Sequence, residues 1–219
     1  MQAHSLAIAR SVNQPAAPFD FADQSEIKLI GMAKSFSRDQ EIFAEGEAAD
    51  WVYKVVSGSV RQVRGLADGR RQICDFYLPG DIFGIEGGAE RQAGAEAVTD
   101  AVVIVARRSS LFADPQGAGI LWRLAVRDLR RCQDHVLTLG RRTAAERVAQ
   151  FMLELADRLG AGEMLELPMS RQDIADYLGL TIETVSRTFT QLQSEGLIEV
   201  HCCRKVRLAR RAALADLCE

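Results

Sequence analysis

The sequence predicts an α+β chain with three parts: an antiparallel β-barrel or jelly roll, a long helix, and a small helical unit ending in a β-hairpin. Three observations predict this order. Short apolar runs broken by glycine fill residues 36–106, an apolar stripe at helical spacing runs through residues 119–143, and residues 169–196 form two short helical patterns around a tight turn. We expect a flexible tail over residues 1–21, then parts spanning 22–116, 117–142 and 143–219.

Composition limits the partners. Of the 219 residues 47% are apolar and 26% charged, which is typical of a well-cored globular protein, and the formal net charge is −3. A net acidic chain does not bind nucleic acid indiscriminately, so any DNA contact must come from a local basic patch. Because we find no membrane-length apolar run and no signal-peptide layout, we expect a cytoplasmic protein without a membrane partner.

The first ordered part is expected to begin with a short helix over residues 22–36, with Ile27, Ile30 and Met32 turned inward. Strands of about four to eight residues follow, and an alternating stretch from Trp51 to Val56 fits a strand with buried faces. The strands are separated by Gly46, Gly58, Gly69 and Gly80. Evenly spaced strands with this punctuation predict the barrel or jelly roll.

The long helix is predicted by apolar residues that recur at spacings of three and four, without a proline, through residues 119–143. This is a coiled-coil seam of about three heptads, which predicts pairing with a second copy; the alternative is a helix packed by the same stripe on its own domain. The seam residues are Trp122, Ala125, Leu129, Cys132, Val136 and Leu139. The flanking arginines are expected to be solvated or to pair across the seam; they are Arg123, Arg127, Arg130 and Arg131. A hinge at residues 140–143 and a helix over 144–159 should follow.

Residues 169–196 read as a helix-turn-helix. Ser170 can cap the first helix with Asp173 at the capping-box position, Gly179 stops it, Thr181 caps the second helix, and Gly196 ends it. The inward faces are Ile174, Ala175 and Leu178 on the first helix, and Val185, Phe189 and Leu192 on the second. The two helices should therefore pack on one shared core.

The outward face of the second helix has the form of a DNA recognition helix, since it carries short polar groups with one acid and one arginine. Its members are Ile182, Glu183, Ser186, Arg187 and Thr190. The alternative is a helical hairpin with an ordinary solvated face. A β-hairpin wing is predicted next, because Ile198, Val200, Val206 and Leu208 alternate around a turn at residues 202–205. Between residues 200 and 211 there are five cations and no acid, which favours phosphate as a partner.

Three stretches over about residues 22–212 resemble the superfamily of the cyclic-AMP receptor protein and the fumarate and nitrate reduction regulator (CRP/FNR). They are EGEAADWVYKVVSGSVR, LPGDIFGIE and DIADYLGLTIETVSRTFTQLQSEGLIEV. Glu183, Ser186 and Arg187 are similar to the E-x-x-S-R set of the fumarate-nitrate branch, and the last stretch most resembles the FixK-type regulators of rhizobia. The resemblance implies a cyclic-nucleotide-binding-like β-roll, a dimerisation helix, a winged helix-turn-helix, contact with RNA polymerase, and control of low-oxygen or nitrogen-related genes.

No cofactor is expected. An iron–sulfur cluster needs about four thiolates, and the β-part contains only Cys74. Haem or a metal centre would need histidine ligands, but His4, His135 and His201 all lie outside the barrel. The same lack of a His, Cys or carboxylate constellation argues against an enzyme.

A cyclic nucleotide is not expected either. The cyclic-AMP branch uses a Gly-Glu pair and an Arg-Ser or Arg-Thr pair, whereas this region reads FGIEGGAERQAGAEAV, in which Arg91 is followed by Gln92. Glu86 and Arg91 remain the residues that a different effector would use. An effector-gated regulator with an unidentified ligand in the β-roll is therefore the alternative to an effector-independent one.

The expected mechanism is sequence-specific activation of transcription by a homodimer on double-stranded DNA, with half-sites about 34 Å apart. By resemblance to the fumarate-nitrate branch, the site is TTGA-N6-TCAA. Arg187 can read guanine, Glu183 can accept from a cytosine or adenine amino group, and Ser186 with the methyl of Ile182 can meet thymine. The expected phosphate contacts are Ser170, Thr181, Arg204 and Lys205.

Cys202 and Cys203 are candidates for redox control. They lie at the wing turn beside Arg204 and Lys205, and nearby cations lower a thiol pKa. Oxidation there would place bulk or negative charge near phosphate and weaken binding; the alternative is that both are inert turn residues. A metal held by His201, Cys202 and Cys203 is disfavoured because adjacent side chains point apart. The five cysteines are odd in number and scattered, which favours reduced thiols.

Overall fold

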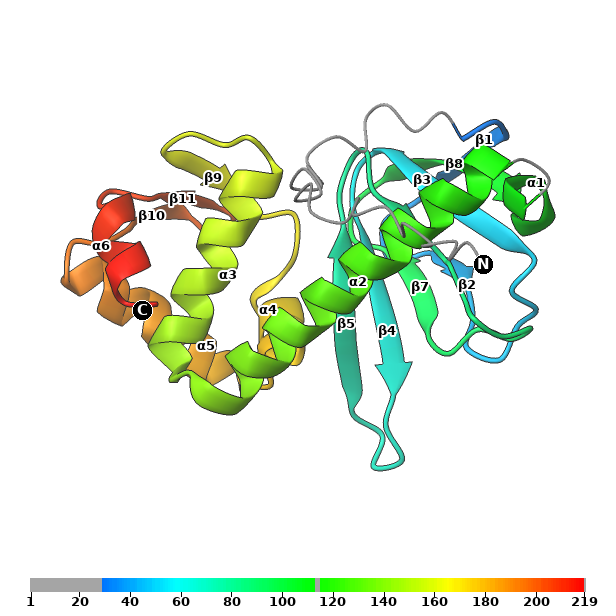
Figure 1. Cartoon of the computed structure of the whole chain (residues 1–219). Coiled ribbons are helices and arrows are strands. Elements are labelled where there is room, and N and C mark those ends of the chain that lie inside the picture. Colours follow the sequence, from blue (N-terminus) through cyan, green and yellow to red (C-terminus); the bar gives the residue numbers. More distant parts are fainter. Residues whose placement is uncertain (1–28, 113–114, 219) are drawn as a thin grey trace, which may run out of the picture.

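The computed structural model describes residues 29–112 and 115–218. Within these ranges a β-roll, a long helix and a C-terminal unit of helices with a small sheet follow one another along the chain (Figure 1). The tail expected over residues 1–21, and Ile27 of the expected short helix, lie outside the described residues. No helix in the described ranges is both long and apolar enough to cross a membrane.

The β-roll consists of two antiparallel four-stranded sheets, in the orders β1-β8-β3-β6 and β2-β7-β4-β5. The strands are β1 Met32–Phe36, β2 Glu41–Phe43, β3 Trp51–Ser57, β4 Val60–Gly65, β5 Arg71–Tyr77, β6 Ile82–Phe83, β7 Gly94–Ala97 and β8 Ala101–Arg107. Side chains from both sheets, among them Phe36, Phe43 and Phe83, form its core. The predicted jelly-roll class is confirmed.

Glycine supplies the turns where a side chain would collide. Gly58, between β3 and β4, has a φ of +78°, and a Cβ there would lie 2.2 Å from the Asp100 carbonyl oxygen. The β3–β4 turn can therefore close only because this position lacks a side chain.

The helix expected over residues 22–36 is wrong for the part that the structure describes. Met32–Phe36 forms β1, which pairs antiparallel with β8, and Ile30 and Met32 are 89% and 74% exposed rather than turned inward. The backbone groups of this segment bond to the edge of a sheet, and Phe36 enters the roll core. Pairing with a strand distant in the sequence outweighs a short local apolar period.

Two helices follow the roll, α1 Arg108–Phe112 and α2 Pro115–Arg141. α2 begins earlier than residue 119, where the stripe begins, and runs diagonally across the roll towards the C-terminal unit (Figure 1). Leu121 and Leu124 are buried on it. Residues 142 and 143 then break the helix, close to the expected hinge.

The C-terminal unit is a winged helix-turn-helix. Its elements are α3 Ala144–Arg158, β9 Met164–Glu166, α4 Arg171–Leu178, α5 Ile182–Ser194, β10 Glu199–Cys202, β11 Lys205–Arg207 and α6 Arg211–Asp216. The predicted hairpin is β10–β11, and β9 adds a third strand to it in the order β10-β11-β9. Sequence reasoning missed β9, a three-residue strand whose central Leu165 is buried in the core of the unit.

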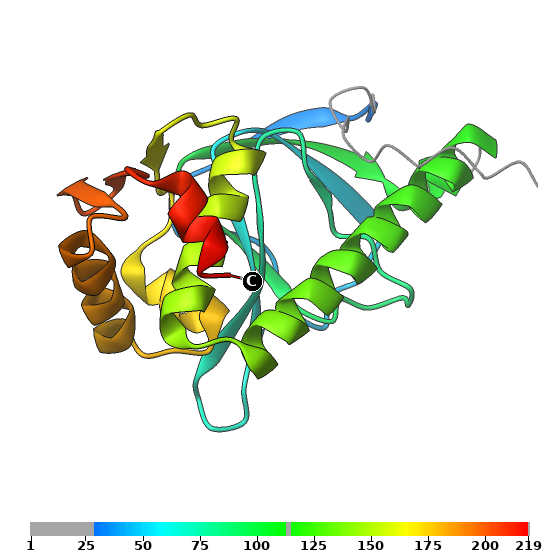
Figure 2. The same ribbon diagram turned by 60° about the vertical axis from the view of Figure 1, so that its left-hand side comes forward.

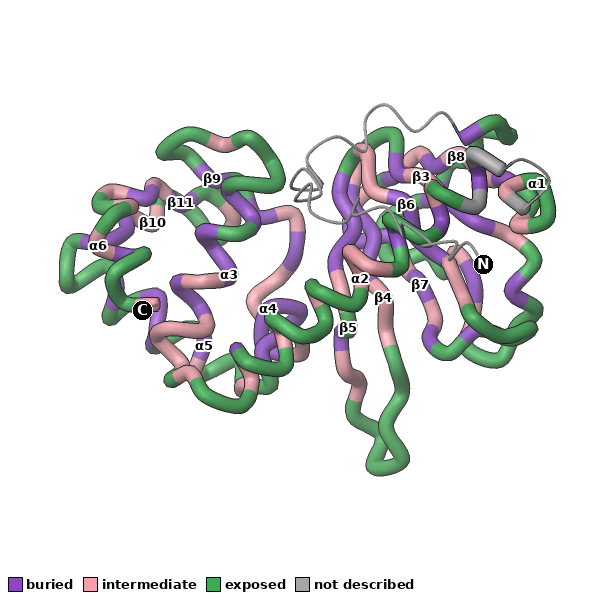
Figure 3. Tube along the Cα trace, in the orientation of Figure 1, coloured by how far each residue is buried: buried purple, intermediate pink, exposed green. Residues whose placement is uncertain are grey.

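The C-terminal unit packs directly against the roll, in addition to its covalent connection through α2. Ile73, Phe76 and Leu78 of the roll are buried in one apolar cluster with side chains of α3, α4 and α5. Both β5 and α4 carry buried residues (Figure 3), the two elements are in contact, and α4 lies between β5 and α5 in both ribbon views (Figures 1 and 2). The two parts therefore share a core.

Candidate nucleic-acid interface

The helix-turn-helix is built by local capping. The Ser170 hydroxyl accepts from the Asp173 amide at 3.1 Å, and the Asp173 carboxylate accepts from the Ser170 amide at 3.0 Å, which closes the expected capping box on α4. Gly179 ends α4 in the left-handed region at φ +62°. Thr181 then caps α5 by accepting from the Thr184 amide at 3.2 Å. These contacts fix the angle at which α5 leaves the turn.

The buried face of α5 determines which residues point outward. Val185, Phe189 and Leu192 are buried as predicted, so the opposite face is directed to solvent. All five residues expected on the outward face are exposed: Ile182, Glu183, Ser186, Arg187 and Thr190. The structure therefore brings the predicted base-reading side chains together on one open surface.

Glu183 is prepared to act as an acceptor. The pKa of its carboxyl is lowered by the backbone amide at the start of α5, by the Thr181 hydroxyl and by the charge of Arg187. A carboxylate that stays ionised offers only acceptor atoms. Glu183 and Arg187, one turn apart on the same face, thus present an acceptor and a fork of donors side by side.

The wing carries fewer available cations than its sequence indicates. Lys205 is exposed, but Arg204 is half-buried and donates to the Pro168 carbonyl at 3.2 Å. Arg207 pairs with Glu199, and Arg211 pairs with Asp157. Sequence counting missed these partners because the acids lie outside the 200–211 window. Of the expected phosphate contacts, Ser170 and Thr181 lie at helix starts and Lys205 faces solvent.

The thiols differ in their surroundings. Cys202 and Cys203 are exposed on the wing, and the pKa of Cys202 is lowered mainly by the backbone amides of Arg204 and Lys205, then by the Lys205 charge. The amides thus contribute more than the cation invoked from the sequence. Among the described residues, no group of three or more His, Cys, Asp or Glu side chains could hold a metal ion.

Arg91 is directed into the β-roll and is engaged by it. Only 2% of the residue is exposed, and its guanidinium donates to the Gly84 carbonyl at 2.6 Å and to the Trp51 carbonyl. Its Cζ atom lies 4.1 Å from the centroid of the Phe43 ring. Gly84 makes room for it, since a Cβ there would lie 2.9 Å from Arg91 Nη1. Glu86 is half-buried. Arg91 thus fills the roll interior near Glu86 with its own side chain.

The α2 stripe is not the face that packs on the roll. Trp122, Leu129 and Val136 are 70%, 57% and 61% exposed in the single chain, and Cys132 is exposed as well, whereas Leu121 and Leu124 make the buried contact. Of the remaining seam positions, Ala125 is exposed and Leu139 is half-buried. The alternative of a helix packed by this stripe on its own domain does not match the structure.

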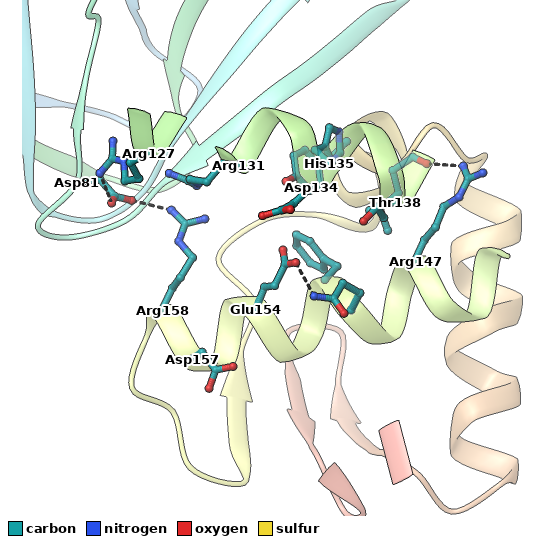
Figure 4. A pocket seen from close by; sticks show the side chains of 14 residues that line it. Asp81, Arg127, Arg131, Asp134, His135, Thr138, Arg147, Glu154, Asp157 and Arg158 are labelled. Carbon is teal, nitrogen blue, oxygen red and sulfur yellow. Dashed lines mark hydrogen bonds and ion pairs between the residues drawn. The ribbon is translucent and has the colours of Figure 1, made fainter. Parts of the chain in front are cut away.

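A cleft of about 410 Å³ lies between α2, α3 and the turn at Asp81 (Figure 4). Its arginines connect α2 and α3 to the roll. Arg158 of α3 donates to Asp81 and to the Phe76 carbonyl, both at 2.6 Å, and Arg131 of α2 donates to Asp75 at 2.6 Å. Arg127 pairs with Asp128 at 2.7 Å. The expectation that Arg127 and Arg131 are solvated or pair across the seam is therefore wrong, because carboxylates of the same chain lie closer.

Comparisons with known proteins agree with this arrangement. A model of the Crp-like helix-turn-helix domain matches residues 146–217, and a model of the cyclic nucleotide-binding domain matches residues 33–113. The nitrogen fixation regulation protein FixK of Azorhizobium caulinodans is 48% identical over 200 residues, covering 87% of this chain and 81% of its own. FixK of Rhizobium meliloti is 42% identical over 187 residues, covering 85% of this chain and 87% of its own.

Among solved structures, FixK2 from Bradyrhizobium japonicum superposes with a TM-score of 0.83 at 47% identity, covering 86% of this chain and 98% of its own. A CRP-family transcriptional regulator from Thermus thermophilus, TTHB099, superposes with a TM-score of 0.72 at 33% identity, covering 84% and 96%. The chain therefore belongs to the CRP/FNR family of transcription regulators, and within it to the FixK branch.

Proposed function

We propose that the protein activates transcription as a homodimer that reads a TTGA-N6-TCAA palindrome in double-stranded DNA through α5. The observation that carries this proposal is the set Glu183, Ser186 and Arg187, exposed together on one face of a helix whose other face is buried. A helix of this form enters the major groove with its first turns against the base edges. The FixK relatives are named as regulators of nitrogen fixation, which supports genes of nitrogen or low-oxygen metabolism as targets and RNA polymerase as a further partner.

The base-reading roles follow from donor and acceptor patterns. The guanidinium of Arg187 donates to O6 and N7 of the guanine in TTGA. Glu183, an ionised acceptor, takes a hydrogen bond from a cytosine or adenine amino group, and Ser186 with the Ile182 methyl meets thymine. Ser170, Thr181 and Lys205 are assigned to the phosphates, which position the protein without specifying sequence. Arg204 joins them only through donors that its contact with the Pro168 carbonyl leaves open.

Dimerisation is supported by the exposed apolar stripe of α2. Trp122, Leu129 and Val136 are exposed to water at heptad spacing in the single chain. Burying their side chains would be favourable by about 25 cal/mol per Å² of apolar surface. Pairing with a second copy along the same stripe buries these side chains. It also places two copies of α5 in a symmetric arrangement, which a palindromic site matches.

Binding without an effector is supported by Arg91. Its Nη1 and Nη2 donate to the Gly84 and Trp51 carbonyls and its Cζ lies over the Phe43 ring, which leaves Nε as its buried donor without a partner in the described structure. A ligand that uses the two terminal nitrogens would first have to displace these contacts. Modulation through Cys202 and Cys203 is supported by their exposure on the wing and by the lowered pKa of Cys202.

A binding titration tests the proposal. Purified, reduced protein without additives is titrated with a duplex carrying TTGA-N6-TCAA and with a duplex in which both guanines are changed, at one fixed salt concentration. Tight binding that depends on the guanines is the expected result. Weak binding of equal strength to both duplexes would contradict the assigned half-site or the independence from an effector, and effector gating would then be the better account.

A further inference from the structure

We propose that Arg61 and Arg71 of the β-roll are positioning residues for DNA recognition. By clamping Asp173 and Asp176 on α4, they hold the helix-turn-helix in one orientation on the roll and so set the half-site spacing that the dimer accepts. We call these four residues the α4 clamp. The inference rests on the proposed function and extends it to residues far from the DNA-reading face.

The clamp is formed by two arginines that converge on one carboxylate. Arg61 Nη1 lies 3.1 Å from Asp173 Oδ1, and Arg71 Nη2 lies 2.8 Å from the same oxygen. Arg71 Nε also donates to Asp176 Oδ2 at 2.6 Å. The side chains of Asp173 and Arg61 are only 4% and 9% exposed. The Arg61–Asp173 pair is therefore largely removed from water, while Arg71, with 36% of its side chain exposed, reaches the same carboxylate from the edge of the contact.

The clamp is continuous with the cap of α4. Oδ1 of Asp173 accepts hydrogen bonds from both arginines. Its Oδ2 accepts from the Ser170 amide at 3.0 Å and from the Ser170 hydroxyl at 2.7 Å. α4 in turn packs on α5 across the three-residue turn at Gly179. A displacement of Asp173 relative to the roll would therefore carry the first turn of α4, and with it α5.

The roll side of the clamp is anchored in turn. Arg61 also contacts Glu96 of β7 at 2.6 Å and Asp39 at 3.1 Å, so it cannot follow α4 without leaving these carboxylates. Arg71 lines the groove between the β4–β5 hairpin and the α4–α5 turn, which run alongside each other (Figure 2). Because Arg61 lies on β4 and Arg71 on β5, the clamp connects both strands of the β4–β5 hairpin to the helix-turn-helix.

Further contacts prevent the unit from pivoting about the clamp. Phe76 of β5 packs on Tyr177 and Phe151, and beyond these rings Arg158 pairs with Asp81 at the cleft of Figure 4. Three separated attachments define an orientation, whereas one would leave a hinge.

Buried ion pairs suit this role. Desolvation of the two charges offsets most of their attraction, so such a pair adds little stability over an apolar contact, while a partner that is lost leaves a buried charge unpaired. In a dimer joined along α2, both rolls are fixed at the seam. With the clamp closed, the distance between the two α5 helices is fixed as well, and only one spacer length fits.

The test compares spacer lengths. Wild type, Arg71→Gln and the control Arg70→Gln are titrated with duplexes carrying TTGA and TCAA separated by five, six, seven or eight bases. Arg70 is the adjacent residue on the same hairpin but pairs only with exposed Asp68, so its loss leaves the clamp intact. We expect wild type and Arg70→Gln to prefer six bases by at least about tenfold, equivalent to about 1.4 kcal/mol, and Arg71→Gln to lose most of this preference while still requiring the guanines.

Two further measurements distinguish a loosened clamp from a poorly folded variant. Hydrogen exchange of the α4 and β5 amides, recorded without DNA, should rise in Arg71→Gln and not in Arg70→Gln. Asp176→Asn, which removes the other end of the Arg71 contact, should reproduce the effect if Arg71→Gln folds poorly.

The possible failures are distinguishable. If wild type binds the six-base site and Arg71→Gln keeps the same spacer preference, the inference is overturned and the proposed function stands. Uniform loss of affinity on every spacer with unchanged exchange would make Arg71 a DNA contact and would also overturn it. If wild type shows no guanine-dependent binding, the proposed function fails and the inference fails with it.

Discussion

Tyr177 of α4 stacks on His135 of α2, with ring centroids 4.1 Å apart and the ring planes 21° from parallel. The other neighbours of Tyr177 are Phe76 of the roll and Phe151 of α3. One ring of the helix-turn-helix therefore contacts the long helix, the roll and α3. This junction connects α4 to three other parts of the molecule at once.

His135 makes the junction sensitive to pH. Burial lowers the pKa of this imidazole, a hydrogen bond that the ring donates to the Tyr177 backbone carbonyl partly offsets this, and the charge of Arg147 lowers the pKa further. The unfolded chain therefore binds a proton more readily than the folded one below about pH 6.5, the ordinary value for His. We expect the free energy of unfolding to fall as the pH drops from 7.5 to 5.5. Urea titrations at both values measure it; an equal fall in His135→Gln would contradict this origin.

We expect dimer formation to depend on the α2 stripe. Leu129→Glu places a charge in the seam, and we expect a dimer to become a monomer, with DNA affinity lowered by at least about tenfold because half of the contacts are lost. Leu137→Glu is the matched control, since Leu137 is 60% exposed on the same helix but lies off the stripe. Analytical ultracentrifugation of both variants measures whether each is a monomer or a dimer. A dimeric Leu129→Glu protein would place the interface elsewhere.

Arg91 is expected to stabilise the roll. Replacing it by Ala leaves a cavity beside Phe43 and removes the donors from two buried carbonyl groups, so the free energy of unfolding should fall by about 2–4 kcal/mol. The exposed neighbour Gln92 offers a control, and its replacement by Ala should change the value by less than about 0.5 kcal/mol. Equal unfolding curves for the two variants would show that Arg91 is not an internal support.

Thiol reactivity should follow the surroundings of each cysteine. Backbone amides lower the pKa of Cys202, whereas desolvation by the surrounding chain raises the pKa of Cys74, although residue 74 reaches the surface. We expect iodoacetamide at pH 7.5 to modify Cys202 well before Cys74, and the modified protein to bind the duplex more weakly, because the adduct lies on the wing. Mass spectrometry and the DNA titration measure both. Unchanged affinity after complete modification of Cys202 would assign it to the inert turn residues.

Much of this architecture could be predicted from local signals. Caps, left-handed glycines and the buried stripes of α4 and α5 depend on residues within one or two helical turns, so the sequence identified Ser170, Gly179 and Thr181 with their roles. Both strands of the wing hairpin could also be predicted, from the alternation of apolar residues around the turn. These features involve short-range contacts, which a pattern of spacing describes directly.

The rest depends on partners distant in the chain. Asp173 could be predicted as a capping residue, but nothing near it indicates Arg61 and Arg71, which lie more than a hundred residues away. The same holds for β1, whose partner is β8, and for Arg204, which is held by Pro168. Arg91 was assigned to a possible ligand because sequence cannot show that the roll itself supplies its acceptors.

The most direct test of base reading by α5 combines one variant with one altered base. Wild type and Arg187→Ala are each titrated with the TTGA-N6-TCAA duplex and with the guanine-changed duplex, at fixed salt. We predict that the variant loses about 1–3 kcal/mol per half-site on the first duplex and binds both duplexes equally. If Arg187→Ala still discriminates between them as wild type does, the guanine is read by another residue, and the assignment of Arg187 as the guanine-reading residue of α5 is contradicted.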